Sequence, residues 1–302
     1  MDPGQLEALA KLGLECRKVS RRDIAAVLAK GQDGATTVSA TMIFADKAGI
    51  PIFVTGGIGG VHRGADATWD VSADLTELGR TAVCVVCAGA KSILDLPRTL
   101  EFLETFCRQV AGYRTSDFPA FFTPRSGLAT SCSVDGPEEA AEVLAQQRQA
   151  CLGSGMVLAV PVPESLAAEG ARVEEATRTA VEESTKLDIR GNEVTPFLLK
   201  RINELTGGES LRSNIALIKH NAEARTEVLL CLRVEWNVGH PCESRSGFAA
   251  VRGRSCCGAG ACEANAPCLP TVKEGCQCPS SGKKKAARFG RDACEMLRPC
   301  PV

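Results

Sequence analysis

The sequence has almost no net charge and no long apolar run. Its 302 residues include 35 Lys and Arg and 36 Asp and Glu, which gives a formal net charge of −1 at pH 7. This balance argues against electrostatic binding to nucleic acid or to a membrane surface as the main role. No run approaches the roughly 20 apolar residues that span a bilayer, and polar residues follow Met1 where a signal peptide would have its apolar core. We therefore expect neither nucleic acid nor a membrane among the partners.

Helical and strand patterns alternate along the first three quarters of the chain. We expect helices at about 6–14, 20–30, 36–48, 97–110, 137–151, 163–184, 196–206 and 211–232, and strands at about 52–54, 82–86 and 156–160. The segment Asp135-Gly136-Pro137 supplies a polar cap and a proline at the start of one of these helices. The alternation predicts an α/β protein, a layered α/β/α sandwich with a largely parallel sheet.

Polar chemistry follows two of the predicted strands. The first strand ends in the loop Gly56–Gly60, whose backbone N–H groups can approach an anion, although a simple connecting turn fits the loop equally well. The second strand is apolar throughout and breaks at Ala88-Gly89-Ala90 to present Lys91. A lysine in that place can lose its proton through desolvation and attack a sugar carbonyl as a neutral amine. A surface lysine at a helix start is the alternative.

Acidic, basic and hydroxyl side chains are concentrated between these two strands. A solvated loop has a similar composition, so this concentration alone does not establish a site. Its members lie within fifteen residues of the glycine loop and are His62, Arg63, Asp66, Asp70, Ser72 and Asp74.

Seven colinear segments carry a resemblance to a known family. They are KVSRRD (18–23), GATTVSATM (34–42), VTGGIGGVHRGA (54–65), DVSADL (70–75), VCAGAKSILD (86–95), SDFPAF (116–121) and RGNEVTPFLLKRINELTGGESLRSNIALIKHNA (190–222). With these segments the chain closely resembles the pseudouridine-5'-phosphate glycosidase family, also called the indigoidine synthase A-like family, over about residues 9–232.

The resemblance implies cleavage of the C–C glycosidic bond of pseudouridine 5'-phosphate to uracil and ribose 5-phosphate. Lys91 aligns with the nucleophile that attacks C1′ of the sugar, and Lys18 with a lysine that contacts the substrate. A cation near Lys91 would also lower the pKa of its amine. A carbon–carbon bond to a base is difficult to break, so a covalent route with an electron sink is chemically needed.

The resemblance also implies a metal ion and a set of binding residues. Asp70 aligns with a carboxylate that holds one divalent ion, expected to be Mn²⁺, because one carboxylate and waters suit a hard, oxygen-preferring ion. Ser72, Ala73 and Asp74 align with a turn that contacts the substrate, and Val38 with a backbone contact. Residues aligned with the pocket lining are Thr55, His62 and Asn214. Asn214 would read the uracil edge, and the family forms homotrimers.

Two of these residues have simpler interpretations. His62 could be a buried histidine that hydrogen-bonds the glycine loop, and Asn214 could be an ordinary helix residue or cap.

The chain departs from the family pattern at its start. Family members have a further strand with a Glu-Ser-Thr segment and a His-Gly-x-Pro turn, and that glutamate is the proposed general acid or base. The present sequence begins at Met1-Asp2-Pro3, after that segment, and Glu183-Ser184-Thr185 repeats the tripeptide without the following turn. We expect a fold that lacks the family's first strand, with turnover impaired by loss of the general acid.

The composition changes near residue 233. Residues 233–302 hold nine of the sixteen cysteines among Gly, Pro and Ser, with no helical or strand period. We expect a glycosidase-like domain at 1–232 and a Cys-rich, disordered tail at 233–302. A zinc module is the alternative, although the tail has no paired C-x₂-C spacing. The cysteines of the first region lack a disulfide framework, which suggests reduced thiols and an intracellular location, in the cytoplasm or an organelle.

Two other functions stay open at this point. One is a catalytically silent isoform that binds sugar phosphate or associates with intact subunits. The other is a thiol-rich, metal-binding protein that acts through its tail.

Overall fold

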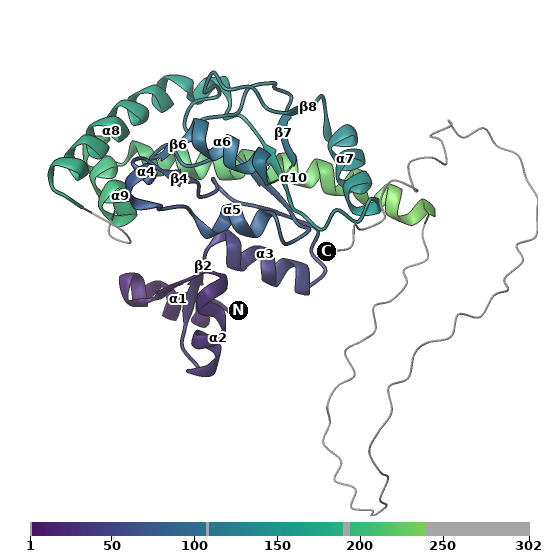
Figure 1. Ribbon diagram of the computed structural model, residues 1–302, viewed down its shortest axis with the longest axis horizontal. Helices are drawn as coiled ribbons and strands as arrows, with labels where there is room; N and C mark the ends of the chain where they lie inside the picture. Colours follow the sequence, from purple (N-terminus) through teal and green to yellow (C-terminus); the bar gives the residue numbers. More distant parts are fainter. Residues whose placement is uncertain (1, 107–108, 190–193, 240–302) are drawn as a thin grey trace, which may run out of the picture. The chain divides into compact units, whose positions relative to one another are not determined.

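The computed structural model describes residues 2–106, 109–189 and 194–239 of the chain (Figure 1). Within these residues the largest sheet has five strands in the order β3-β5-β9-β7-β8, and every pairing in it is parallel. The strands are β3 (Ile52–Val54), β5 (Cys84–Cys87), β7 (Gln109–Tyr113), β8 (Cys132–Val134) and β9 (Met156–Ala159). The predicted α/β fold with a largely parallel sheet is therefore confirmed.

Helices cover both faces of this sheet. All residues of β5 are buried, with Cys84 and Val86 in one apolar cluster and Val85 and Cys87 in the other. The first cluster joins the sheet to α7 (Pro137–Gln149) and the second half of α10 (Glu209–Gly239). The second cluster joins it to α3 (Val38–Lys47), α5 (Ala73–Leu78), α6 (Leu96–Thr105) and α8 (Ala167–Lys186). An entirely apolar strand is thus covered on both sides, as parallel sheets require.

The remaining elements are short. Strands β1 (Arg17–Val19) and β2 (Gly34–Thr36) form a parallel pair, and β4 (Val61–His62) pairs antiparallel with β6 (Leu94–Asp95). The other helices are α1 (Pro3–Leu12), α2 (Arg21–Ala29), α4 (Ala65–Thr68) and α9 (Val194–Leu205), with 3₁₀ turns at Gly13–Glu15 and Glu164–Leu166.

Several expected boundaries differ from the structure. The helix expected at 97–110 is wrong at its end, because α6 stops at Thr105 and Val110 lies inside β7. Pairing with β9 on one side and β8 on the other places this segment in the sheet, and that tertiary constraint overrides local pattern. Strands of two or three residues such as β1, β2, β4, β6 and β8 are too short to show a period, and we did not expect them.

The expected boundary at residue 233 falls inside a helix. Helix α10 continues to Gly239, so the absence of helical structure expected from 233 onward is wrong for 233–239. The segment before Gly239 contains no glycine or proline that would end the helix sooner. The rest of the predicted tail, 240–302, lies outside the described residues, and its predicted disorder and the zinc alternative stay predictions.

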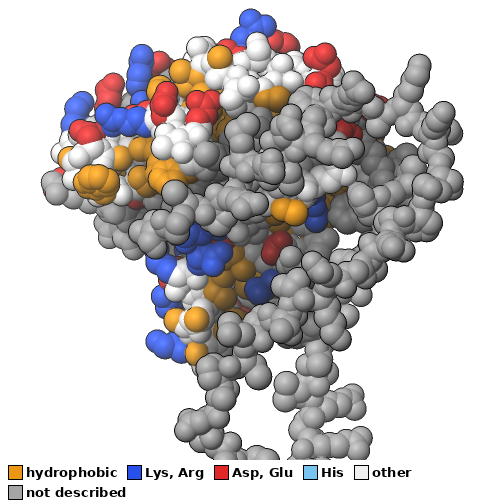
Figure 2. All heavy atoms as spheres, turned by 45° about the vertical axis from the view of Figure 1, so that its right-hand side comes forward, with side chains coloured by type: hydrophobic (Ala, Val, Ile, Leu, Met, Phe, Trp, Pro, Cys, Tyr) orange, Lys and Arg blue, Asp and Glu red, His pale blue; other side chains and the backbone are white. Residues whose placement is uncertain are grey.

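The surface of the described residues carries charges of both signs, in agreement with the near-zero net charge of the sequence (Figure 2). On the face shown in Figure 2, Lys and Arg side chains lie among Asp and Glu side chains, with apolar side chains between them. None of the helices in the described residues combines the length and apolar character that crossing a bilayer requires.

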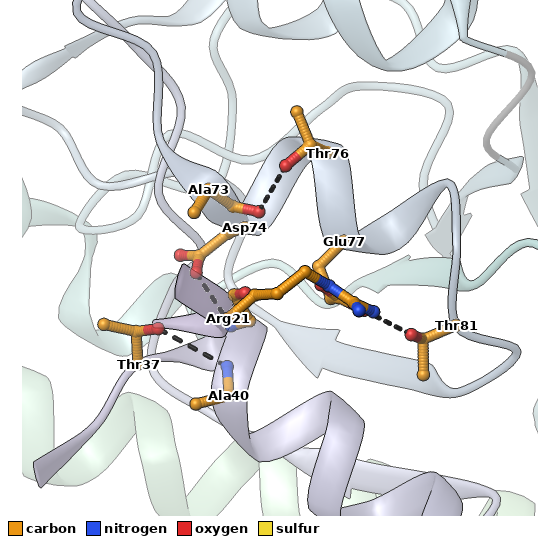
Figure 3. Close-up of polar contacts among 9 residues, drawn as sticks. Arg21, Thr37, Ala40, Ala73, Asp74, Thr76, Glu77 and Thr81 are labelled. Atoms are coloured by element: carbon orange, nitrogen blue, oxygen red, sulfur yellow. Dashed lines mark hydrogen bonds and ion pairs between the residues drawn. The ribbon is translucent and has the colours of Figure 1, made fainter. Parts of the chain in front are cut away.

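A buried carboxylate ties α5 to α2. Glu77 is 1% exposed and accepts a hydrogen bond from Arg21 Nε at 2.6 Å, while the Thr81 hydroxyl also donates to it (Figure 3). Burial opposes the ionised form of Glu77, but the hydrogen bonds from Arg21 and Thr81 outweigh it, so the pKa of Glu77 lies below its ordinary value of 4.5. The link connects the start of α2, just after β1, with the helix that carries Asp74.

Arg21→Ala should therefore destabilise the fold. We expect the free energy of unfolding to fall by about 1–3 kcal/mol at pH 7, the cost of leaving a buried polar group without its partner. The folded-state pKa of Glu77 is depressed, so its contribution is present above pH 4.5 and is lost as the pH falls through the lowered pKa. The difference in the free energy of unfolding between variant and parent, measured by urea unfolding, should become smaller in acid. Arg22→Ala, whose side chain is 82% exposed, is the control, and an equal loss in both variants would contradict the link.

Candidate active site

Two backbone loops meet at one edge of the central sheet. Because β3 and β5 are parallel neighbours, the glycine loop and the turn that carries Lys91 leave the sheet side by side. Ala88 N–H donates to Gly56 O at 2.9 Å, Ile58 N–H to Gly89 O at 3.1 Å and Lys91 N–H to Ile58 O at 3.1 Å. Ligands of open parallel sheets bind at this carboxyl edge, where loops from several strands converge.

Close packing explains the glycines of the first loop. A Cβ on Gly57 would lie 2.5 Å from the Phe121 ring, and one on Gly59 would lie 2.6 Å from Ser72 Cβ and 2.8 Å from Asp74 Oδ2. Neither glycine has a positive φ, so the requirement is space rather than an unusual backbone conformation. The loop is therefore pressed against the segment that contains Ser72 and Asp74.

The anion in the glycine loop is a side chain of the protein itself. Asp74 is 5% exposed, and its carboxylate accepts hydrogen bonds from Gly59 N–H at 2.9 Å and from Ser39 N–H at 2.8 Å. Thr37 caps α3 by accepting a hydrogen bond from Ala40 N–H (Figure 3). Ser39 lies in the first turn of α3, and Ser72 caps α5. Asp74 thus fixes the start of α3 to the glycine loop.

Lys91 combines burial with charged neighbours. Burial lowers the pKa of its amine, the charge of Asp74 opposes that change, and the charge of Lys18 adds to it. The lowered pKa increases the fraction of neutral amine, which is the form that attacks a carbonyl carbon. Lys18 itself lies on β1 with an exposed side chain.

His62 lies between the basic and acidic parts of the site. Its Nδ1 is 3.9 Å from Asp70 Oδ2, and its backbone N–H donates to Asp70 O at 3.0 Å. Burial lowers the pKa of His62, Asp70 opposes this, and Lys18 and Lys91 lower the pKa further. The imidazole is therefore mainly neutral at pH 7.

The other predicted residues border the same loops. Thr55 N–H donates to Val86 O at 2.9 Å, and Asn214 Oδ1 lies 2.9 Å from the point where a Cβ on Gly56 would stand. Val38 and Ala73 are the first residues of α3 and α5, the two helices that Asp74 joins. The structure thus brings together residues from β1, α3, the glycine loop, β4, α5, the turn after β5 and α10.

Three polar residues that sequence reasoning missed also shape this edge. Asn221 is 1% exposed and donates to Thr55 O at 2.9 Å, and Thr99 Oγ1 accepts from Val61 N–H at 2.9 Å. Ser39 contributes through its backbone N–H, which donates a hydrogen bond to the Asp74 carboxylate. Asn221 could have been found, because it follows Asn214 by seven residues and two helical turns place both on one face.

The described residues offer little protein coordination for a metal ion. No group of three or more His, Cys, Asp or Glu that could hold one occurs among them. The Asp70 side chain is 39% exposed, so a single carboxylate is accessible for an ion that keeps most of its waters. That donor chemistry fits a hard divalent cation such as Mn²⁺ and does not fit zinc.

Two cavities lie away from these residues. One of about 510 Å³ opens beside β7 and β8 and is lined by Arg114, Thr115, Ser116, Asp117, Arg125, Ser133 and Asp135. A second of about 530 Å³ is bordered by α1, α2 and Phe44 of α3. Neither contains a predicted site residue.

Comparison with known proteins gives a consistent result. The family described as indigoidine synthase A like protein matches residues 1–230. A pseudouridine-5'-phosphate glycosidase from Caldanaerobacter subterraneus is 53% identical over 218 residues, covering 72% of this chain and 71% of that protein. The Arabidopsis thaliana protein of the same name is 49% identical over 228 residues, covering 76% and 69%.

Solved structures share the fold. The prealnumycin C-glycosynthase AlnA in complex with ribulose 5-phosphate has a TM-score of 0.73 at 35% identity and covers 78% of each chain. An indigoidine synthase A-like protein from Thermotoga maritima has a TM-score of 0.68 at 36% identity, covering 78% of this chain and 76% of that one.

Lys18→Met should raise the pKa of Lys91, because a nearby cation disfavours the protonated amine. The measurement is the pH dependence of Lys91 labelling by an amine-reactive reagent, followed by mass spectrometry. Lys11→Met is the control, since Lys11 pairs with Glu7 on α1. A labelling midpoint that stays put or falls in Lys18→Met would contradict this electrostatic coupling.

Proposed function

The chain belongs to the indigoidine synthase A-like family, and we propose that it cleaves the C–C glycosidic bond of pseudouridine 5'-phosphate, releasing uracil and ribose 5-phosphate. The observation that carries this proposal is the Lys91 amine, whose pKa is lowered by burial at the edge where the loops after β3 and β5 meet. The relatives support the substrate class, since those compared above are named for this activity.

Lys91 acts as the nucleophile in this proposal. Its neutral Nζ attacks C1′ of the sugar, the C1′–O4′ bond breaks, and the ring oxygen takes a proton. The C1′–C5 bond to the base then breaks as the nitrogen lone pair forms an imine with C1′, and the leaving uracil carbon takes the proton released from nitrogen. Water hydrolyses the imine to the sugar aldehyde and free Lys91. The nitrogen lone pair supplies the electron push that direct cleavage lacks, and the uracil ring takes the electron pair of the broken bond.

Positive potential places the phosphate in this proposal. The exposed amine of Lys18 favours an anion, and Val38 at the start of α3 would offer a backbone contact. Ser72 and Ala73 at the start of α5 would contact the sugar, and Asn214 would read the uracil edge.

The lining residues have separate tasks. Thr55 directly precedes the glycine loop, and His62 lies in β4. Because His62 is mainly neutral, it adds no second positive charge beside Lys91. In this proposal the amine of Lys91 approaches C1′. The burial of Asp74 keeps its carboxylate bound to backbone N–H groups while a substrate enters.

Asp70 would hold the divalent ion, which we propose to be Mn²⁺. The ion, when bound, supplies positive charge beside the sugar phosphate. One partly exposed carboxylate gives weak, easily chelated binding, with waters as the remaining ligands. The Asp70 carboxylate itself places a negative charge next to His62, and this side chain is partly exposed to solvent.

Borohydride reduction in the presence of ribose 5-phosphate should trap the sugar on Lys91. The label should be absent in Lys91→Met, whose turnover should fall to background because the only proposed nucleophile is gone. Peptide mass spectrometry identifies the labelled residue, and uracil release measures turnover.

Lys47→Met, which changes an exposed lysine at the end of α3, is the matched control and should label normally. Label on Lys18 instead of Lys91, or no label in parent protein that binds ribose 5-phosphate, would refute the assigned nucleophile.

Asp70→Asn should weaken Mn²⁺ binding at least about tenfold, a loss of about 1.4 kcal/mol, because the carboxylate charge is removed. Titration calorimetry on the chelator-treated protein measures this directly. Asp66→Asn removes an equal charge from the same connection, where Asp66 pairs with Arg98, and should leave the affinity unchanged. Unchanged affinity in Asp70→Asn would place the ion elsewhere.

A further inference from the structure

The turn that carries Lys91 is held on two sides. The glycine loop binds one side through the hydrogen bonds described above. On the other side Phe121 N–H donates to Ala88 O at 2.9 Å, and Gly89 forms a bridge with Ala120. Gly89 has a φ of +83°, and a Cβ there would collide with the Pro119 carbonyl oxygen. Residues 119–121 therefore form a wall directly against the Lys91 turn.

This wall belongs to a loop that the Asp117 carboxylate helps to close, together with backbone hydrogen bonds between its two arms. Residues 115–130 leave β7 and return to β8, and we call them the 115–130 loop. The Asp117 carboxylate accepts hydrogen bonds from Ser126 N–H at 2.7 Å and from Gly127 N–H at 3.2 Å. Ser126 Oγ lies within hydrogen-bonding distance of both Asp117 and the carbonyl oxygen of Phe118. Phe118 N–H donates to Leu128 O at 2.7 Å, so the two arms are joined next to the wall.

The wall has an unfavourable backbone conformation that needs external support. Phe121 has a φ of +64°, a left-handed conformation that is unfavourable for a residue with a side chain. Such a conformation persists only where its surroundings enforce it. The Phe121 ring is buried against Gly57, so the wall touches the glycine loop and the Lys91 turn together.

We propose that Asp117 is a positioning residue for Lys91, acting through the 115–130 loop and its contact with Gly89. This inference rests on the proposed function and adds a residue that does not touch the substrate. Asp117 shares no contact with Lys91. It keeps the loop closed, the closed loop keeps Phe121 and Ala120 against the turn, and the turn keeps the amine in its desolvated place. The charged and titratable groups that face the amine are Asp74, Lys18 and His62.

Asp117→Asn tests the proposal, because the amide places a donor where Gly127 N–H now finds an acceptor. The loop should loosen, water should reach the amine, and the pH midpoint of borohydride trapping by ribose 5-phosphate should rise. Each unit of upward shift lowers the neutral fraction, and with it the trapping rate at pH 7, about tenfold. We expect kcat to fall by at least this factor with little change in KM. A role confined to stability would lower the melting temperature and leave the midpoint at its parent value.

Asp135→Asn is the matched control. Asp135 lines the same cavity and is exposed, and among the described residues its carboxylate makes no hydrogen bond to the 115–130 loop. If Asp117→Asn does not fold, Asp117→Ser carries the same comparison, since it also removes the carboxylate and keeps a short polar side chain.

The outcomes separate this inference from the proposed function. Trapping on Lys91 in the parent with an unshifted midpoint in a folded Asp117 variant would overturn the positioning role alone. No trapping in the parent would overturn the proposed function first.

Discussion

The carboxylate of Asp74 joins the parts of the chain that form the candidate site, and their placement depends on it. Its oxygens accept the N–H groups of Gly59 and Ser39, which belong to the loop after β3 and to the first turn of α3. Because the carboxylate is buried, losing either partner would leave a charged group unsatisfied, at a cost well above that of an ordinary surface contact. Glycine at position 59 is the matching steric requirement, since any side chain there would displace Asp74 and Ser72. The glycine loop, α3 and α5 therefore keep one arrangement.

The same carboxylate takes part in the electrostatic balance at Lys91. Taken alone, a nearby negative charge would keep the amine protonated. Burial is the larger effect, and Lys18 acts in the same direction, so the pKa of Lys91 falls. A reactive amine can thus lie near an acidic group without being held in the charged form. The same arrangement leaves Lys18 exposed and available to an anionic substrate.

Much of the fold could be predicted from local pattern, and the failures have a common cause. The apolar run at β5 predicted a strand covered on both faces, and α7 begins at Pro137 as that proline indicated, although its N-cap is Gly136 and no polar side chain caps it. The helix expected at 97–110 ran too far, because Val110 pairs with β9 and no local signal reports that partner. Strands β1, β4 and β6 are only two or three residues long and exist through their pairing. At 233–239 composition suggested loss of order, whereas the helix continues to Gly239.

The sequence by itself determined the fold class, the family and the strand ends that border the candidate site, because apolar periodicity and long colinear motifs are local properties. It also indicated Lys91, since a lysine after a buried apolar strand stands out in the chain. Only the tertiary structure decided that the glycine loop holds Asp74 rather than an external anion, and that Asn221 supports the loop through Thr55 O. It alone placed the 115–130 loop against Gly89. These relations join residues far apart in the chain, and their energy comes from burial and close approach, which a linear pattern does not encode.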